Sequence, residues 1–285
     1  MRLALGISPC PNDTFVFHGL LSGAVRVPGV ELEFELLDVQ ALNDALATRR
    51  FDVAKASTSA ALASGAEWLA LRAGAALGFG VGPLLLGAPG RSVDADGRIP
   101  AGARVLCPGE RTTAHLLYRA LHRGEGRVEQ VVFSAILPAL QRGEADFGVC
   151  IHEGRFTWQR YGLAFVEDLG ATWEARARTP LPLGLILARR VLPHDVLRAL
   201  DDGIRASLEH ARAHRDEVYA TMRRHAQELD DDALWKHVEL YVNAWTRDLG
   251  REGREALARL RLAALECGAL EADAPELGVL GDVPR

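Results

Sequence analysis

The chain has little lysine, no dense block of like charge and no long apolar segment, and each scarcity removes a class of protein. Its 285 residues include 33 basic and 38 acidic side chains, with a net charge of −5. Only Lys55 and Lys236 are lysines, and no basic arm for nucleic acid is present. The longest uncharged stretch, 73–90, holds six glycines and two prolines, so it does not predict a membrane-spanning helix.

Cysteine is also scarce, and its spacing fits no known metal or disulfide framework. The four cysteines lie far apart, without a C-x-x-C pair, at Cys10, Cys107, Cys150 and Cys267. We therefore expect no metal, no cofactor and a reducing compartment. The apolar stretch at residues 1–7 is too short for a secretory signal, which favours a cytoplasmic protein.

Short apolar runs alternate with helical patterns through the first two thirds of the chain. The runs have strand length and fall at 3–7, 31–37, 52–56, 69–73, 83–87, 104–107, 130–133, 146–151 and 183–188. This alternation predicts an α/β fold with mostly parallel sheets. From 195 to 264 only helical periodicity remains, which predicts a helical C-terminal region.

The length allows one large domain or two lobes with a cleft between them. An Ala-Leu pair, five further residues and an aspartate precede the strand at Asp52, and the same pattern returns 94 positions later at Asp146. The two strands end in polar segments at Lys55 and His152. Ligands of open α/β sheets lie beyond such strand ends, so the repeat suggests one ligand held between two lobes. Generic α/β patterning explains the same repeat.

Two segments are candidates for chemistry. His152 follows an apolar strand, and histidine suits proton transfer near neutral pH, although a hydrogen-bonded histidine at a strand end is the simpler interpretation. A glycine-containing turn precedes Thr112 and Thr113 at a helix start, where free N–H groups could hold a carboxylate or phosphate. Either threonine could instead only cap the helix.

Other side chains leave their roles open. Lys55 at a strand end could be a cation for an acidic ligand or a surface lysine. Cys10 lies in a turn with two prolines, and no base is placed beside it by the sequence. His210 and His214 are four residues apart on a charged helix without the glutamate of a metalloprotease, so we expect them in solvent. The glycines of 78–82 precede a strand, which excludes a Rossmann loop and favours a hinge or a close approach to a ligand.

Six segments, in this order, resemble one enzyme family over essentially the whole chain. They are Ser8-Pro-Cys-Pro-Asn-Asp-Thr-Phe15, Lys55-Ala-Ser57, Gly82-Pro-Leu84, Pro108-Gly-Glu-Arg-Thr-Thr-Ala114, Ile151-His-Glu-Gly-Arg-Phe-Thr157 and Leu181-Pro-Leu-Gly184. The chain is similar here to the 1,4-dihydroxy-6-naphthoate synthases of the futalosine route to menaquinone. It departs from relatives at Gly154, where a serine can stand, and at Thr58, where an aromatic residue can stand.

The resemblance implies a two-lobed α/β fold like that of type II periplasmic binding proteins, with a central cleft. Residues 1–90 with 184–285 would form the larger lobe, and 91–183 the smaller one. The implied enzyme is a cytoplasmic, cofactor-independent carbon–carbon lyase that converts cyclic dehypoxanthine futalosine to 1,4-dihydroxy-6-naphthoate and dihydroxyacetone. His152 would be the proton acceptor. The residues implied to bind substrate are Lys55, Ala56, Ser57, Thr113 and Ala114.

Three rivals share the scaffold. One is a sibling menaquinone enzyme resembling chorismate dehydratase, and another is a non-catalytic protein that binds a small carboxylate. The third is the effector-sensing half of a transcription regulator, which the lack of a helix-turn-helix pattern before the first strand disfavours. We expect a small-molecule carboxylate as the partner, without nucleic acid or membrane, and the sequence does not fix the oligomeric state.

Overall fold

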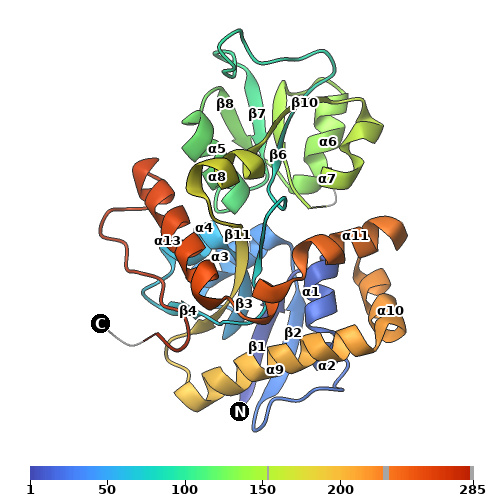
Figure 1. Cartoon of the computed structure of the whole chain (residues 1–285), viewed down its shortest axis with the longest axis vertical. Coiled ribbons are helices and arrows are strands. Elements are labelled where there is room, and N and C mark those ends of the chain that lie inside the picture. The colour runs from blue at the N-terminus through green and yellow to red at the C-terminus, as the bar shows by residue number, and fades with distance from the viewer. Residues whose placement is uncertain (153, 227–230, 283–285) are drawn as a thin grey trace.

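A computed structural model describes residues 1–152, 154–226 and 231–282. The described chain forms two α/β lobes, one above the other in Figure 1, each built around its own sheet. Residues 227–230, within the predicted helical region, residues 283–285, at the end of the predicted larger lobe, and Glu153 of the His-Glu segment lie outside the described ranges.

The larger lobe contains a six-stranded sheet with the order β2-β1-β3-β11-β4, and β5 pairs with β11. Its strands are β1 (Arg2–Ile7), β2 (Glu31–Leu36), β3 (Val53–Ser57), β4 (Trp68–Ala70), β5 (Ala76–Gly78) and β11 (Leu181–Arg189). Every residue of β3 is buried, as expected for a central strand covered on both faces. Residues 55–57 form the carboxyl end of β3 and lie at the edge of the sheet that faces the smaller lobe.

The smaller lobe contains a five-stranded sheet with the order β10-β6-β9-β7-β8. Its strands are β6 (Leu84–Gly87), β7 (Arg104–Cys107), β8 (Arg127–Gln130), β9 (Phe147–Cys150) and β10 (Ala164–Asp168). The chain thus changes sheets between β5 and β6, and returns between β10 and β11. Since β6 belongs to the second sheet, the crossing lies before the boundary at residue 90 that the resemblance implied.

The expectation of mostly parallel sheets was wrong. The pairs β1–β2, β1–β3, β7–β8 and β7–β9 are parallel, whereas β11 is antiparallel to all its partners and β6 is antiparallel to β9 and β10. The physical reason is the path of the chain. β6 and β11 are the strands that carry it into each sheet from the other lobe, and they enter against the direction of the strands beside them.

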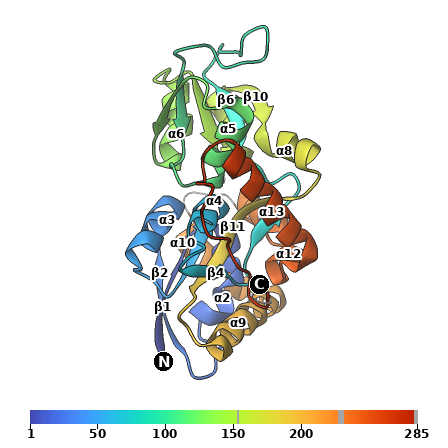
Figure 2. The same cartoon turned by 90° about the vertical axis from the view of Figure 1, so that its left-hand side faces the viewer.

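Helices cover the faces of both sheets (Figures 1 and 2). In the first two thirds they are α1 (Pro11–Val16), α2 (His18–Leu21), α3 (Val39–Thr48), α4 (Thr58–Ala63), α5 (Thr113–His122), α6 (Phe133–Gln141), α7 (Gly154–Thr157), the 3-10 helix η1 (Trp158–Tyr161) and α8 (Leu169–Ala177). The region 130–133, predicted as a strand, contains the end of β8 and the start of α6. Strands β5 and β10 were not predicted.

The C-terminal region is helical as predicted, with α9 (His194–Ala213), α10 (Arg215–His225), α11 (Asp231–Tyr241), α12 (Ala244–Arg247) and α13 (Gly250–Glu266). Helices α9, α10 and α11 pack on α1, and their apolar faces close one core of the larger lobe. Helix α13 lies beside β11 and also contacts α5 of the smaller lobe (Figure 2). Among the described residues, every helix is too short or too polar to cross a lipid bilayer.

Candidate active site

A cavity lies between the two lobes, where the strand ends of both sheets meet. All six residues that the resemblance singled out line it: Lys55, Ala56, Ser57, Thr113, Ala114 and His152. The first three come from the end of β3, the next two from the first turn of α5, and the last from the turn after β9. Residues from both lobes therefore face one cavity.

A buried ion pair forms the floor of the cavity on the larger lobe. Lys55 Nζ donates to Asp13 Oδ1 at 2.8 Å, and the two residues are only 6% and 2% exposed. Ser8 Oγ donates to Asp13 Oδ2 at 2.6 Å, and Asn12 Nδ2 donates to Oδ1 at 2.9 Å. The lysine is thus not a surface residue, and Asp13 compensates its charge. Lys55 Nζ also donates to Gly74 O at 3.3 Å, which leaves one of its three N–H donors for a ligand.

The start of helix α5 supplies backbone donors. Thr112 is the residue that caps the helix, because its hydroxyl accepts from His115 N at 3.2 Å. The hydroxyl of Thr113 acts differently, since it donates to Leu183 O of β11 at 2.9 Å. Among the described residues, the N–H groups of Thr113 and Ala114 meet no protein acceptor, as expected in a first helical turn. These N–H groups and the helix dipole favour an anionic group in the cavity.

Ser57 is held rigidly opposite this helix start. Asn43, fully buried on α3, donates from Nδ2 to Ser57 Oγ at 3.0 Å and accepts from Ser57 N at 2.8 Å. The serine hydroxyl keeps its own hydrogen to donate to a ligand, because it acts as the acceptor in the bond to Asn43. Asn43 could not be identified from the sequence, since a buried asparagine inside a helix has no local motif.

His152 sits in a strained backbone position at the cavity wall. Its φ of 55° lies in the left-handed region, which is uncommon for residues other than glycine and is typical of functional sites. Its Nδ1 lies 3.7 Å from Cys10 Sγ, and its ring packs edge-on against Phe133 with the centroids 5.0 Å apart. The fold therefore places a thiol from the larger lobe beside the candidate base of the smaller lobe, which the sequence could not show.

A second histidine, His237 on α11, also lines the cavity and was missed in the sequence. Its Nε2 lies 3.0 Å from Asn12 Oδ1, and because the Asn12 amide nitrogen donates to Asp13, the oxygen must accept from Nε2–H. Burial, and then the neighbouring His152, lower the pKa of His237 to about 3. His237 is therefore neutral, and its Nδ1 is a buried acceptor without a partner among the described residues.

Arg155, of the segment after His152, joins the two crossings between lobes. Its Nη1 donates to Gly82 O at 2.7 Å, and its Nη2 pairs with Asp168 Oδ2 at 2.6 Å. Gly82 itself packs backbone to backbone on Gly170, since a Cβ there would lie 2.2 Å from the Gly170 Cα. The glycine-rich segment thus permits a close contact at the crossing, whereas the sequence predicted a hinge or a close approach to a ligand.

Taken together, the cavity offers a place for an anion at α5, a compensated lysine, and two histidines, of which His237 is neutral. The positive charge of Lys55 and the negative charge of Asp13 cancel, so the net charge of the cavity does not by itself define the ligand. The arrangement can hold a small carboxylate by one end and move a proton at the other. The described residues of the cavity include no cluster of side chains close enough to hold a metal ion.

Comparison with known proteins gives a consistent assignment. A sequence profile of a family described as menaquinone biosynthesis matches residues 3–266. A protein of Thermus thermophilus named 1,4-dihydroxy-6-naphthoate synthase is 47% identical over 275 residues, covering 96% of this chain and 97% of the relative. A protein of the same name from Streptomyces coelicolor is 39% identical over 280 residues, covering 96% of each.

Solved structures agree on the fold. A crystal structure of an Archaeoglobus fulgidus protein has a TM-score of 0.87 at 28% identity, covering 94% of this chain and 98% of that one. A Candida albicans protein described as having the generic periplasmic binding protein fold has a TM-score of 0.66 at 13% identity, covering 100% and 99%. The two-lobed, periplasmic-binding-protein-like fold expected from the sequence is confirmed.

Proposed function

The chain belongs to the menaquinone biosynthesis family, and from this premise we propose that its interlobe cavity is the active site of a carbon–carbon lyase. The reaction is the conversion of cyclic dehypoxanthine futalosine to 1,4-dihydroxy-6-naphthoate and dihydroxyacetone. The relatives named for the naphthoate product match nearly the whole chain. The observation that carries the proposal is the meeting of residues 55–57, 113–114 and 152 in one cavity.

The carboxylate of the substrate binds at the start of α5. The N–H groups of Thr113 and Ala114 donate to it, and the dipole of this ten-residue helix adds a favourable field. Ser57 donates from the opposite lobe, with its position fixed by Asn43. Lys55 contributes its remaining N–H donor, and Ala56 leaves room for the ring of the substrate beside it. Substrate therefore bridges the lobes.

His152 accepts the proton that starts the fragmentation. The proton comes from the sugar-derived ring of the substrate, the carbon–carbon bond breaks, and aromatisation of the bicyclic product helps to drive the step. General-base assistance of this kind accelerates a reaction by roughly 10²- to 10⁴-fold. Positioning of substrate between the lobes and exclusion of water supply much of the remainder.

His237 positions the substrate and does not act as the base. A pKa of about 3 makes its ring too weakly basic to take up a proton at neutral pH. Its unpartnered Nδ1 accepts a hydrogen bond from a hydroxyl of the bound substrate. A buried acceptor of this kind discriminates against a ligand that lacks the hydroxyl.

Location, boundaries and partners follow from the same proposal. The enzyme acts in the cytoplasm, and its partner is a small carboxylate, with no nucleic acid. The smaller lobe comprises the chain from β6 to α8, and the rest forms the larger lobe, because these are the segments that share each sheet. In this proposal the boundaries lie at the two crossings, the first of them ahead of residue 90.

The test is incubation of the purified chain with cyclic dehypoxanthine futalosine, with chromatographic detection of 1,4-dihydroxy-6-naphthoate. A parallel incubation with chorismate tests the sibling dehydratase reaction, and calorimetry with each compound detects binding without turnover. Naphthoate formation from the cyclic substrate supports the proposal. Turnover of chorismate alone, or tight binding with no product, contradicts it and favours the sibling enzyme or a receptor.

A further inference from the structure

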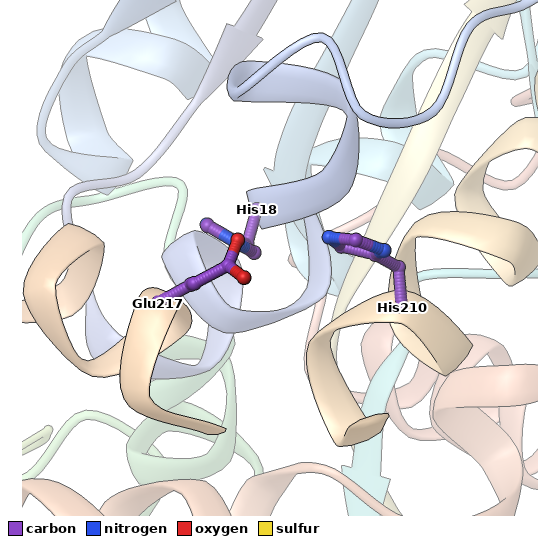
Figure 3. A group of neighbouring side chains, drawn as sticks. All are labelled: His18, His210 and Glu217. Atoms are coloured by element: carbon purple, nitrogen blue, oxygen red, sulfur yellow. The ribbon is translucent and has the colours of Figure 1, made fainter. Parts of the chain in front are cut away.

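Away from the cavity, two histidines and a glutamate from three helices converge in the larger lobe. His18 lies on α2, His210 on α9 and Glu217 on α10, and Figure 3 shows their side chains turned toward one another. Each offers one donor atom, and these atoms all lie within 4.8 Å of one another. His210 was expected in solvent from its place on a charged helix, but its side chain is half-buried.

His18 is built like a metal ligand. The residue is 3% exposed, and its Nδ1 lies 2.9 Å from the Thr221 hydroxyl. Its other nitrogen, Nε2, is buried and has no hydrogen-bond partner among the described residues. Ligating histidines commonly bind the metal with one ring nitrogen and fix the ring through a hydrogen bond at the other.

His210 offers a second buried nitrogen from α9. Its Nε2 is also buried and also lacks a partner in the described part of the chain. Two buried nitrogens without partners in one small volume are unusual, because buried polar groups are normally satisfied. No direct hydrogen bond joins the two rings, which lie 5.6 Å apart between centroids. Two imidazoles on one tetrahedral zinc ion have centroids about 5 Å apart, given the usual Zn–N bond length.

The surroundings of His18 include charged and titratable groups from two other helices. Burial, followed by the nearby His210, lowers the pKa of His18 from its usual value. Glu217 acts in the opposite direction on that pKa, as a negative charge near the ring. Its side chain is exposed, so it can turn to shorten its distance to the two nitrogens.

We propose that His18, His210 and Glu217 bind a divalent metal ion of the zinc type. Two imidazole nitrogens and a carboxylate oxygen are a donor set that zinc accepts, and water completes the tetrahedron. The ion joins α2 to α9 and α10, which pack around α1. Since α1 carries Asn12 and Asp13, the ion braces the outer side of the lobe behind the cavity. This role is structural and does not depend on the proposed reaction.

The test is isothermal titration of Zn²⁺ into the full chain after chelator treatment, with a phosphine reductant present. One ion per chain is expected to bind, and Co²⁺ in its place is expected to give the visible absorption of a tetrahedral site. His18→Gln, His210→Gln and Glu217→Gln are each expected to weaken binding about tenfold or more. His225→Gln, a histidine on α10 outside the cluster, is the matched control and is expected to bind as wild type.

A thermal readout of Glu217→Gln and one further variant keep the result decisive. Glu217 is exposed, so Glu217→Gln folds even if loss of a buried histidine disturbs packing, and the rise in Tm that Zn²⁺ produces in wild type is expected to shrink in this variant. Cys10→Ser removes the thiol 3.7 Å from His152 Nδ1, a pair that lies outside the cluster, and so tests whether the titrated zinc binds to this thiol instead of to the three residues. The proposal is overturned if Zn²⁺ does not bind, if binding survives all three ligand substitutions, or if it is lost in Cys10→Ser.

Discussion

Single residues of the cavity owe their properties to burial more than to their chemical type. Lys55 is a cation by type, yet Asp13 neutralises it, and removal of either partner would leave an uncompensated charge in a buried place. His237 is a base by type, yet burial prevents it from taking a proton. Assignment of chemistry at this site therefore requires the surroundings of each group.

The pH dependence of stability tests the state of His237. Its pKa is about 3 in the folded protein and about 6.5 in the unfolded chain, so the unfolded state binds the extra proton between these values. The stability that the neutral ring contributes is complete above pH 6.5 and falls as the pH is lowered toward 3, by at most about 1.4 kcal/mol per pH unit. His237→Asn is expected to remove this part of the acid sensitivity in urea unfolding experiments.

His194→Asn is the control, because His194 is exposed on α9. Its unfolding free energy should follow the wild-type pH curve. In activity, His237→Asn is expected to raise KM for the cyclic substrate about tenfold, the effect of one lost hydrogen bond. If the unfolding free energy of His237→Asn fell with acid as steeply as that of wild type, the ring would already take up its proton in the folded state.

Local signals in the sequence indicated His152 and Lys55, which follow apolar strands, and the threonines at the start of a helix. Ala56, Ser57 and Ala114 came only from the resemblance to the naphthoate synthases. Asn43 and His237 could not be found in this way. Both lie inside amphipathic helices, and only the tertiary fold brings them beside residues 14 and 225 positions away in the chain.

At the scale of elements, the weak internal repeat is a real structural correspondence. Asp52 Oδ2 accepts from Ala4 N at 3.0 Å, and Asp146 Oδ2 accepts from Arg104 N at 2.8 Å. In each lobe the aspartate thus joins the start of one central strand to the neighbouring parallel strand. The two half-sites of the cavity are built on the same strand and helix arrangement, which is why their polar ends face each other.

This equivalence predicts matched energetic costs. Asp52→Ala and Asp146→Ala each remove a charged acceptor from a backbone N–H, so each is expected to lower the unfolding free energy by about 1.5–3 kcal/mol. The sites belong to different sheets and share no partner, so the double variant is expected to show the sum. Denaturant unfolding of the three variants measures this. If only one of the two substitutions lowered the unfolding free energy, the two aspartates would not be structurally equivalent.

The direction of the strands was the element-level feature that the sequence could not reveal. Apolar runs at 83–87 and 183–188 look like any other buried strand, and nothing local marks them as the strands that cross between lobes. Their antiparallel pairing follows from the path of the whole chain. Glycine at the crossing was the available hint, since Gly82 lies two residues before β6.

Gly82 provides a test of that crossing. Gly82→Ala places a Cβ 2.2 Å from the Gly170 Cα, and backbone on both sides cannot yield without moving one lobe. We expect a loss of about 3 kcal/mol in unfolding free energy, the upper range for overpacking, together with a fall in kcat. Thermal unfolding and turnover measure the two effects.

Gly143→Ala is the matched control for the crossing. Gly143 has a φ of +69° and open space around its Cβ position, so alanine there is expected to cost about 1–2 kcal/mol from backbone strain alone, with kcat unchanged. If Gly82→Ala behaves like Gly143→Ala, the close contact between the crossings does not matter for the site.

At the scale of the whole molecule, the two lobes provide unlike halves of one site. The larger lobe supplies the ion pair, Ser57 and His237, and the smaller lobe supplies the helix start and His152. In the proposed reaction neither lobe by itself provides both the proposed base, His152, and the ion pair with Ser57. Helix α13 and the two crossings connect the lobes, so the chemistry depends on how these connections set the distance across the cavity.

In the proposed reaction, His152 removes the proton that starts fragmentation of the substrate. The most direct test is steady-state kinetics of His152→Gln on cyclic dehypoxanthine futalosine, beside wild type and His194→Gln as the surface control. We predict that kcat falls about 10²- to 10⁴-fold while KM changes little, because the base acts in the transition state and the carboxylate is held elsewhere. A His152→Gln enzyme with wild-type kcat would contradict the account.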